Sequence, residues 1–230
     1  MNEIIQHSLF FGGILTLMAY AVGYWLKRKW KLAVFNPLLV GIVLVVIFLL
    51  ACRVDYDTYN EGAKYISYLL TPATVCLALP LYQQFEALKR NFAAIMAGIV
   101  SGAVTSAVCV LGLSVLFRFS HKEYVTLLPK SITTAIGMGI SQELGGFVTI
   151  TVAVIVITGV VGNILAEYVC RWFRIQEAVA KGIAIGSSSH AAGTAKALEM
   201  GEIEGAMSSL SIAVSGLITV LLANIFASFY

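Results

Sequence analysis

Charged residues are scarce in this sequence. Asp, Glu, Lys and Arg make up only 12% of its 230 residues, whereas 59% are hydrophobic. Ordinary soluble domains carry about 25% charged residues, and no long polar stretch here would form such a domain beside the apolar segments. The composition therefore predicts an all-α polytopic membrane protein, folded as a single transmembrane domain over residues 1–230.

The motifs of common enzymes and metal sites are also missing. The sequence has no HExxH, GxSxG, GxGxxG or Walker motif, and its four cysteines form no CxxC pair. Such fixed spacings bring catalytic or metal-binding groups together. Basic residues gather at the borders of apolar segments, as in membrane proteins. We therefore expect no enzymatic activity, no cofactor, no bound metal and no nucleic-acid partner.

Six apolar segments approach the length of about 20 residues that a membrane span needs. Lys27, Arg28 and Lys29 follow the first segment, which predicts that it ends in the cytoplasm. The third segment holds Pro72 and Pro80, which each remove a backbone donor and bend a helix. Residues 53–64 are predicted to form an outer loop. The six predicted spans are residues 5–26, 33–52, 65–85, 92–117, 147–169 and 206–229.

Two stretches are too polar and too rich in glycine to be ordinary spans. Residues 129–146 read PKSITTAIGMGISQELGG, and residues 186–205 read GSSSHAAGTAKALEMGEIEG. An offset of 56 residues aligns Ser131 with Ser187, Gly137 with Gly193 and Glu143 with Glu199. We interpret them as two copies of one broken intramembrane element. They lie within residues 125–146 and 182–205 of a core, 65–230, that follows a two-span scaffold, 1–64.

The distribution of basic residues predicts whether these elements cross the membrane. If both dip in and return, the cytoplasmic side holds nine Lys or Arg residues and the outer side four; if both cross, the counts become six and seven. Basic residues favour the cytoplasmic side. The sequence therefore predicts two re-entrant elements that enter from opposite sides as an inverted repeat, with both termini outside. The nine are Lys27, Arg28, Lys29, Lys31, Lys89, Arg90, Arg171, Arg174 and Lys181, and the four are Arg53, Lys64, Arg118 and Lys122.

The broken elements are the candidate binding site. An unpaired backbone group in hydrocarbon costs several kcal/mol, so irregular backbone survives there only beside a polar cavity or inside protein. The stretches are rich in hydroxyl side chains, and the N-termini of two half-helices would present free amides to an anion. We therefore predict a carboxylate site near the bilayer midplane. The candidate substrate-binding residues are Ser131, Thr133, Thr134, Ser188, Ser189, His190, Gly193 and Thr194.

Five titratable residues in these stretches allow more than one role. His190 would pair with an anion, carry a coupling proton, or serve as a hydrogen-bonded structural residue. Lys130 and Lys196 would either steer an anion or extend to the headgroup level. Glu143 and Glu199 occupy matching positions and would relay protons, although Glu199 also begins an acidic run typical of a solvated loop.

Two helix faces are predicted to lie inside the bundle. Gly98, Gly102 and Ser106 are four residues apart, a spacing that favours close helix packing more than ligand binding. Small-residue faces of this kind also allow a homo-oligomer. Asn163 and Glu167 are likewise four apart, so they share one helix face.

The sequence resembles the LrgB/CidB family of membrane proteins. The resemblance rests on LPKSITTAIGM at 128–138, VITGVVGN at 156–163 and KGIAIGSSSHAAGTAKALEMGEIEGAMSSL at 181–210. It extends over most of the chain. Members commonly have TTPIA where this chain has TTAIG at 133–137, so Gly137 is expected to provide the break that a proline provides elsewhere.

The resemblance implies two functions. Some relatives look like carriers of small monocarboxylates such as pyruvate, glycolate and glycerate. Others were named as regulators of murein hydrolase activity and autolysis that work with a small holin-like partner, LrgA or CidA. We therefore expect a secondary transporter of small monocarboxylates in the bacterial inner (plasma) membrane, with proton coupling. The alternative is a holin-associated membrane component that has no substrate site of its own.

Overall fold

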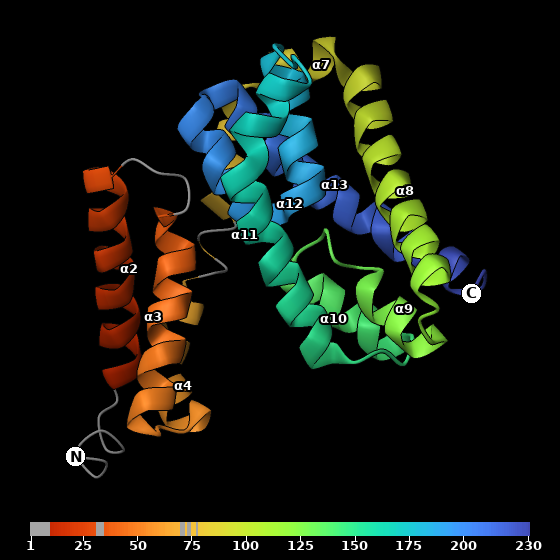
Figure 1. Cartoon of the computed structure of the whole chain (residues 1–230). Coiled ribbons are helices and arrows are strands. Elements are labelled where there is room, and N and C mark those ends of the chain that lie inside the picture. The colour runs from red at the N-terminus through yellow and green to blue at the C-terminus, as the bar shows by residue number, and fades with distance from the viewer. Residues whose placement is uncertain (1–9, 31–34, 70–71, 73–74, 77) are drawn as a thin grey trace. The chain divides into compact units, whose positions relative to one another are not determined.

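The chain folds entirely into helices over the residues that can be described. The computed structural model describes residues 10–30, 35–69, 72, 75–76 and 78–230, and these contain no strand. The predicted all-α class is thus confirmed. The chain divides into two compact units, Met1–Cys76 and Leu77–Tyr230, and each is described by itself (Figure 1).

The first unit consists of helices α2 (Phe11–Trp30), α3 (Pro37–Cys52) and α4 (Tyr56–Ser67). The basic cluster that was expected to follow the first span forms the last turn of α2 instead, and residues 5–9 of that span lie outside the described range. The predicted outer loop is helical over most of its length, where it forms α4, and its position on the outer side stays a prediction. This helix packs on α2, where the Tyr59 hydroxyl lies 2.8 Å from Thr16 Oγ1.

The predicted third span, 65–85, is not one continuous helix in the described part of the chain. Helix α4 ends at Ser67, and the short helices α6 (Ala78–Gln83) and α7 (Phe85–Arg90) are separated by a turn at Gln84. The two prolines in this segment disfavour an unbroken helix. Residues 70–71, 73–74 and 77 of this predicted span lie outside the described range.

Three helices of the second unit are long and apolar enough to cross a membrane, the only such helices in the described ranges. They are α8 (Phe92–Phe117), α11 (Val148–Trp172) and α13 (Glu202–Ala227), and they match the last three predicted spans to within four residues. Helix α3 has 16 residues, a length of about 24 Å at 1.5 Å per residue. It is therefore shorter than the hydrocarbon core of about 30 Å.

The remaining helices of the second unit are α9 (His121–Leu127), α10 (Thr134–Glu143) and α12 (Ala178–Met200). Helices α9 and α10 lie at one end of this unit and α7 at the other (Figure 1). A capping box starts α9, in which the Glu123 carboxylate accepts hydrogen bonds from the backbone and hydroxyl of Ser120. These bonds favour the charged carboxylate and lower the pKa of Glu123.

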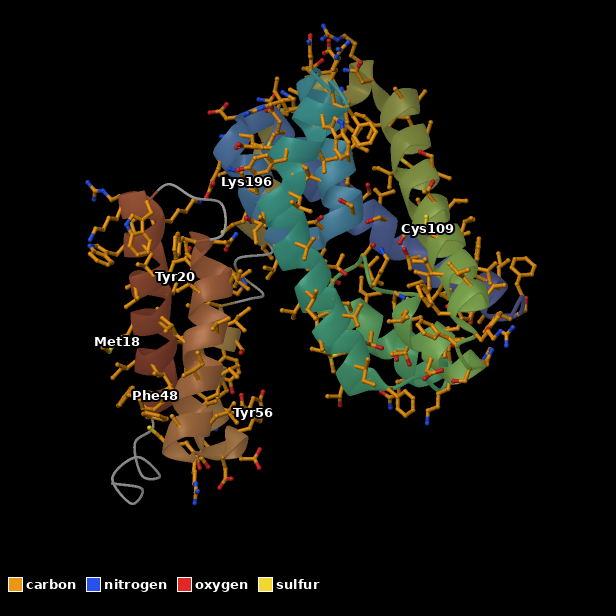
Figure 2. All side chains as sticks on the ribbon, viewed as in Figure 1. Met18, Tyr20, Phe48, Tyr56, Cys109 and Lys196 are labelled. Atoms are coloured by element: carbon orange, nitrogen blue, oxygen red, sulfur yellow. The ribbon has the colours of Figure 1, made fainter. Side chains whose placement is uncertain are left out.

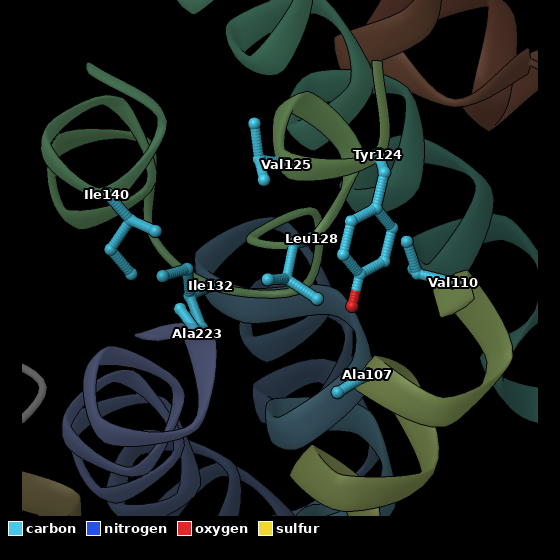
Figure 3. Packing of buried hydrophobic residues seen from close by; sticks show 8 residues of the cluster. All are labelled: Ala107, Val110, Tyr124, Val125, Leu128, Ile132, Ile140 and Ala223. Carbon is cyan, nitrogen blue, oxygen red and sulfur yellow. The ribbon is translucent and has the colours of Figure 1, made fainter. Parts of the chain in front are cut away.

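An apolar cluster holds α9 and α10 against the ends of α8 and α13. Figure 3 shows its buried members, Ala107, Val110, Tyr124, Val125, Leu128, Ile132, Ile140 and Ala223. The Tyr124 hydroxyl donates to the Phe226 carbonyl at 3.0 Å, and the Tyr230 hydroxyl donates to the Ser114 carbonyl at 3.2 Å. The end of the chain is thereby tied to the elements that support the site described next.

Candidate functional site

The first polar stretch forms a helical hairpin, called hairpin 1, which comprises α9, residues 128–133 and α10. The start of α11 holds both of its helices, because the Phe147 N–H donates to Thr126 Oγ1 of α9 at 2.8 Å and the Thr151 hydroxyl lies 2.9 Å from the Thr126 carbonyl oxygen and 2.7 Å from Ser141 Oγ of α10. The break falls at residues 128–133 and not at Gly137, so that expectation is wrong. Gly137 lies inside α10, where its missing side chain leaves room for Ile155.

The second stretch, helix α12, breaks at His190. The backbone there has φ 42° and ψ −141°, a conformation rare for a residue with a side chain. The two halves fold back on each other, and together they are called hairpin 2. Gly186 and Thr194, which lie on opposite sides of the break, both meet Ser208 of α13. The break thus lies at a histidine and not at one of the glycines of this stretch.

The fold of hairpin 2 depends on contacts of His190 with α11. His190 Nε2 lies 2.9 Å from the Ile155 carbonyl oxygen, which accepts only, so this nitrogen carries the proton. A Cβ atom at Gly159 would lie 2.5 Å from His190 Cε1. The missing side chain at Gly159 thus makes room for the imidazole, and the hydrogen bond holds the strained residue in place.

The tips of the two hairpins meet near the middle of the spanning helices. On α11, Ile155 contacts Gly137 of hairpin 1 through its side chain and His190 of hairpin 2 through its carbonyl. On α8, Gly102 faces Ser187, and the hydroxyl of Ser106, one turn later, lies 3.1 Å from Ser131 Oγ. Two segments 56 residues apart in sequence therefore share one polar region.

Lys130 provides the positive charge of this region. Its ammonium donates to Ser131 Oγ at 2.9 Å, and its side chain lines a cavity of about 890 Å³ between α8 and the first half of α12. Ser131, Ser187 and Ser188 line the same cavity. Among the residues that the structure describes, no carboxylate forms an ion pair with Lys130. Arg90 and Glu177 also line this cavity, so the unpaired ammonium of Lys130 lies among several hydroxyls in a cavity that holds a second cation and a carboxylate as well.

A second cavity adjoins Lys130 on the other side of the first half of α12. Its volume is about 450 Å³, and Lys130, Ala184 and Ser188 line both cavities. The rest of its wall is mostly apolar and comes from α11 and α12. Lys130 and Ser188 thus lie between a cavity with many hydroxyl groups in its wall and a second cavity whose wall has fewer polar residues.

The remaining predicted binding residues of α12 stabilise hairpin 2. Ser189, His190, Gly193 and Thr194 are all buried. The Thr194 hydroxyl lies 2.7 Å from Ser208 Oγ, and Gly193 is packed against Ser189 and Ile185. Of these four residues only Ser189 lines a described cavity, the apolar one.

Two predicted hydroxyl donors of hairpin 1 lie outside both cavities. Thr133 and Thr134 are half-buried and line neither cavity. Thr133 occupies the position before the first turn of α10, and its side chain makes no capping hydrogen bond. Lys130 and Ser131 are thus the predicted residues of hairpin 1 that reach the cavity.

The other charged candidates are placed away from the tips. Lys196 donates to the Glu167 carboxylate at 2.7 Å and to that of Glu199 at 3.3 Å. Figure 2 labels Lys196 in the upper part of the second unit. The loop interpretation of Glu199 is wrong, because this residue lies in the last turns of α12. Glu143 is exposed near the end of α10.

The prediction that Asn163 and Glu167 share a face of α11 that looks into the bundle is confirmed for Asn163, whereas the Glu167 side chain, for which an interfacial position was the alternative, is 44% exposed. Asn163 Nδ2 donates to the Ala192 carbonyl at 2.6 Å, and Glu167 binds Lys196 one turn further along. Both contacts hold the second half of α12 against α11. Within the described ranges, no three His, Cys, Asp or Glu side chains gather as a metal site would require.

Sequence reasoning missed one wall of the larger cavity. Ser101, Thr105 and Cys109 of α8 line it together with Ser106. The glycines of α8 were assigned to packing, which is correct, since Gly98 and Gly102 meet Ile183 and Ser187. The missed signal is the spacing of Ser101, Thr105 and Cys109, four residues apart, which places small polar groups on the adjoining face.

Cys109 allows the larger cavity to be tested directly. It is exposed and lines that cavity, whereas Cys170 is buried (Figure 2). We expect a positively charged thiol reagent to label Cys109, and pyruvate at saturating concentration to slow this labelling at least about threefold. Mass spectrometry of the labelled peptide measures the rate. The Cys109→Ser variant measures the background labelling of other sites. Labelling of Cys109 that pyruvate leaves unchanged would contradict occupation of the cavity by a carboxylate.

A family model and several known proteins match almost the whole chain. The model of the LrgB-like family matches residues 16–229. The chain is 38% identical to the holin-like protein CidB of Staphylococcus epidermidis and 37% identical to that of Staphylococcus aureus, over the full length of both chains. It is 36% identical to the antiholin-like protein LrgB of Bacillus mycoides over 96% of each chain. No solved structure matches this chain.

Proposed function

Since this chain belongs to the LrgB-like family, we propose that it works in a holin-like or antiholin-like membrane system and transports small monocarboxylates such as pyruvate, glycolate or glycerate. The first part is supported by the names of its relatives. The second part is supported by one observation, the uncompensated ammonium of Lys130 among hydroxyls at the meeting point of two broken helices.

The energetic argument starts from the cost of a charge inside the membrane. A lysine at the centre of a spanning helix costs about 2.5–3.5 kcal/mol on insertion scales. Lys130 has one serine hydroxyl as its hydrogen-bond partner, which does not neutralise the charge. A carboxylate in the cavity would supply the missing counter-ion, and Ser131 and Ser188 would donate to its oxygens.

The helix ends at the tips do not determine the sign of the bound ion. Each tip combines the N-terminus of one half-helix, about +0.5 charge, with the C-terminus of the other, about −0.5 charge. These contributions oppose one another over short distances. The full charge of Lys130 therefore makes the site selective for anions.

The hairpins would also provide alternating access. We propose that they enter from opposite sides as an inverted repeat, with both termini outside the plasma membrane. The chain would act as a carrier and not as an enzyme, and it would use no cofactor. Rocking of hairpin 1 relative to α12 would expose Lys130 and its bound carboxylate to each side in turn.

His190 and the acidic residues would serve this movement rather than bind the substrate. The Nε2 proton of His190 is held by Ile155, so only Nδ1 remains to take up a proton. A coupling proton on Nδ1 would change the charge at the tip of hairpin 2 without breaking its contact with α11. Lys196 would be a structural link between the second half of α12 and α11.

The second candidate function is a membrane component that regulates lysis without a substrate site of its own. The names of the relatives, holin-like and antiholin-like, favour it. Such a component would act through a small LrgA- or CidA-like membrane protein or through a homo-oligomer. It would not need the cavity around Lys130.

Uptake by reconstituted protein separates the two candidates. We expect labelled pyruvate or glycolate to enter liposomes with saturable kinetics. The double substitution Ser131→Ala and Ser188→Ala should raise KM at least about tenfold, because a hydrogen bond to a charged group contributes about 1.5–3 kcal/mol and about 1.4 kcal/mol corresponds to a factor of ten. Ser228→Ala, at an exposed position in the last turn beyond α13, is the control.

Flux that rises linearly with concentration, or that the double substitution leaves unchanged, would favour the component without a site. The same assay with a co-reconstituted LrgA-like protein shows whether that partner is required. Uptake that appears only in its presence would assign transport to the pair.

A further inference from the structure

The apolar cavity beside Lys130 has no role in binding a three-carbon acid. Its volume of about 450 Å³ falls within the range of about 300–1,000 Å³ that ligand sites occupy. Ile157, Val161 and Leu165 of α11 and Ile185 of α12 contribute apolar wall. Burial of hydrocarbon in such a space is favourable, by about 0.8 kcal/mol per methylene.

The position of the ammonium relates this apolar space to a particular chemistry. Lys130 and Ser188 line both cavities, so a carboxylate held by them has hydroxyl groups on one side and apolar side chains on the other. A ligand with a charged head and a hydrocarbon tail matches both surfaces at once. A ligand that is polar throughout leaves the apolar cavity unused.

We propose that the apolar cavity is a tail subsite, so that the protein also binds monocarboxylates with chains of four to eight carbons, the carboxylate at Lys130 and the tail against Val161 and Leu165. This inference rests on the proposed carboxylate site at Lys130. It extends that site from small oxo and hydroxy acids to short and medium-chain fatty acids. Such acids compete with pyruvate for Lys130.

Inhibition of pyruvate uptake by butyrate, hexanoate and octanoate tests the subsite. Each added methylene is expected to lower the half-inhibitory concentration about three- to fourfold, the factor that corresponds to about 0.8 kcal/mol. Hexanol partitions into the bilayer but lacks the carboxylate, so it serves as a ligand control. It should not inhibit at the concentrations at which hexanoate does.

Two matched substitutions on α11 locate the effect. Val161 and Val156 are similarly exposed, at 45% and 37%, but only Val161 lines the apolar cavity. We expect Val161→Trp to fill the cavity and raise the ratio of the hexanoate half-inhibitory concentration to the pyruvate KM at least about tenfold. Val156→Trp should change this ratio less than about twofold.

The outcomes distinguish this inference from the function on which it rests. Saturable pyruvate uptake, combined with inhibition that does not depend on chain length or on Val161, would overturn the tail subsite alone. Absence of saturable uptake would overturn the carrier, and direct binding would then decide the subsite: hexanoate binding that is absent, or equal in the two variants, would overturn it. A direct readout by isothermal calorimetry of hexanoate binding to the purified protein in detergent covers that second case, because binding lost in Val161→Trp and kept in Val156→Trp supports the subsite even without transport.

Discussion

Replacement of Lys130 by methionine is expected to lower kcat/KM for pyruvate uptake by at least about 30-fold. Removal of one partner from a desolvated charge pair costs about 2–5 kcal/mol, and each 1.4 kcal/mol corresponds to a factor of ten. Methionine keeps much of the length of the side chain but cannot neutralise a carboxylate. Lys130→Arg, which keeps the charge, should retain part of the activity. Initial rates of uptake into liposomes at several pyruvate concentrations measure the effect.

The same substitution has an opposite effect on stability, which separates binding from a structural role. In the empty protein, Lys130 is an ammonium without an ion-pair partner among the described residues, so its removal relieves a desolvation cost. The thermal midpoint in detergent should stay constant or rise, as is usual for residues that serve function at the expense of stability. Pyruvate should raise the midpoint of the unmodified protein and leave that of the variant unchanged.

Lys89→Met provides the matched control. The Lys89 side chain is 60% exposed and lies near Glu86 on α7, away from the hairpin tips. Exposed pairs of this kind contribute about 0–1 kcal/mol, so uptake and stability should both be unaffected. Equal losses of uptake in the Lys89 and Lys130 variants, or a lower thermal midpoint for Lys130→Met, would contradict the role of Lys130 as the anion-binding cation.

The spanning helices of the second unit were predictable because polar residues flank their apolar segments. Helix α8 lies between Asn91 and Arg118, and its predicted and observed bounds coincide. Helix α4 was not predictable in this way. It is polar, with Asp57, Glu61 and Lys64 on its surface, and its helical state reflects packing of Tyr59 on α2.

The location of the broken elements was also predictable, but the residues that break were not. Polar, glycine-rich sequence marked both stretches. Propensity alone would place the second break at Gly193 or Gly186, whereas both glycines are packed against neighbouring atoms that leave no room for a side chain. The break falls at His190 because α11 offers it a carbonyl and the space at Gly159. These contacts with α11 stabilise the strained backbone of His190, and they come from the tertiary structure, so no local sequence pattern reveals them.

Replacement of Gly186 by alanine adds only one methyl group, but this group is expected to destabilise the second unit. Gly182 and Gly186, four residues apart, bring the first half of α12 against the backbone of α13. A Cβ atom at Gly186 would contact the Ser208 carbonyl oxygen and lie 2.8 Å from Ser208 Cα. Because these are backbone atoms, the helices must separate. Overpacking of this kind costs about 1–3 kcal/mol, and it should also weaken the hydrogen bond between Ser208 and Thr194.

Gly139→Ala is the matched control, because it is the same substitution in the same unit with the opposite expected sign. No atom lies within 4 Å of a Cβ atom at Gly139, and alanine is favoured over glycine inside a helix by about 1 kcal/mol. For a unit of this size, 1 kcal/mol shifts the thermal midpoint by about 2–4 °C. Because the helix preference of alanine applies at both positions, overpacking sets the difference between the variants, and we expect the midpoint in detergent to be about 2–12 °C lower for Gly186→Ala than for Gly139→Ala, which should stay constant or rise. If both variants melt alike, the close contact between α12 and α13 does not exist in the membrane-extracted protein, and hairpin 2 cannot be held in the position that brings Ser187 and Ser188 to Lys130.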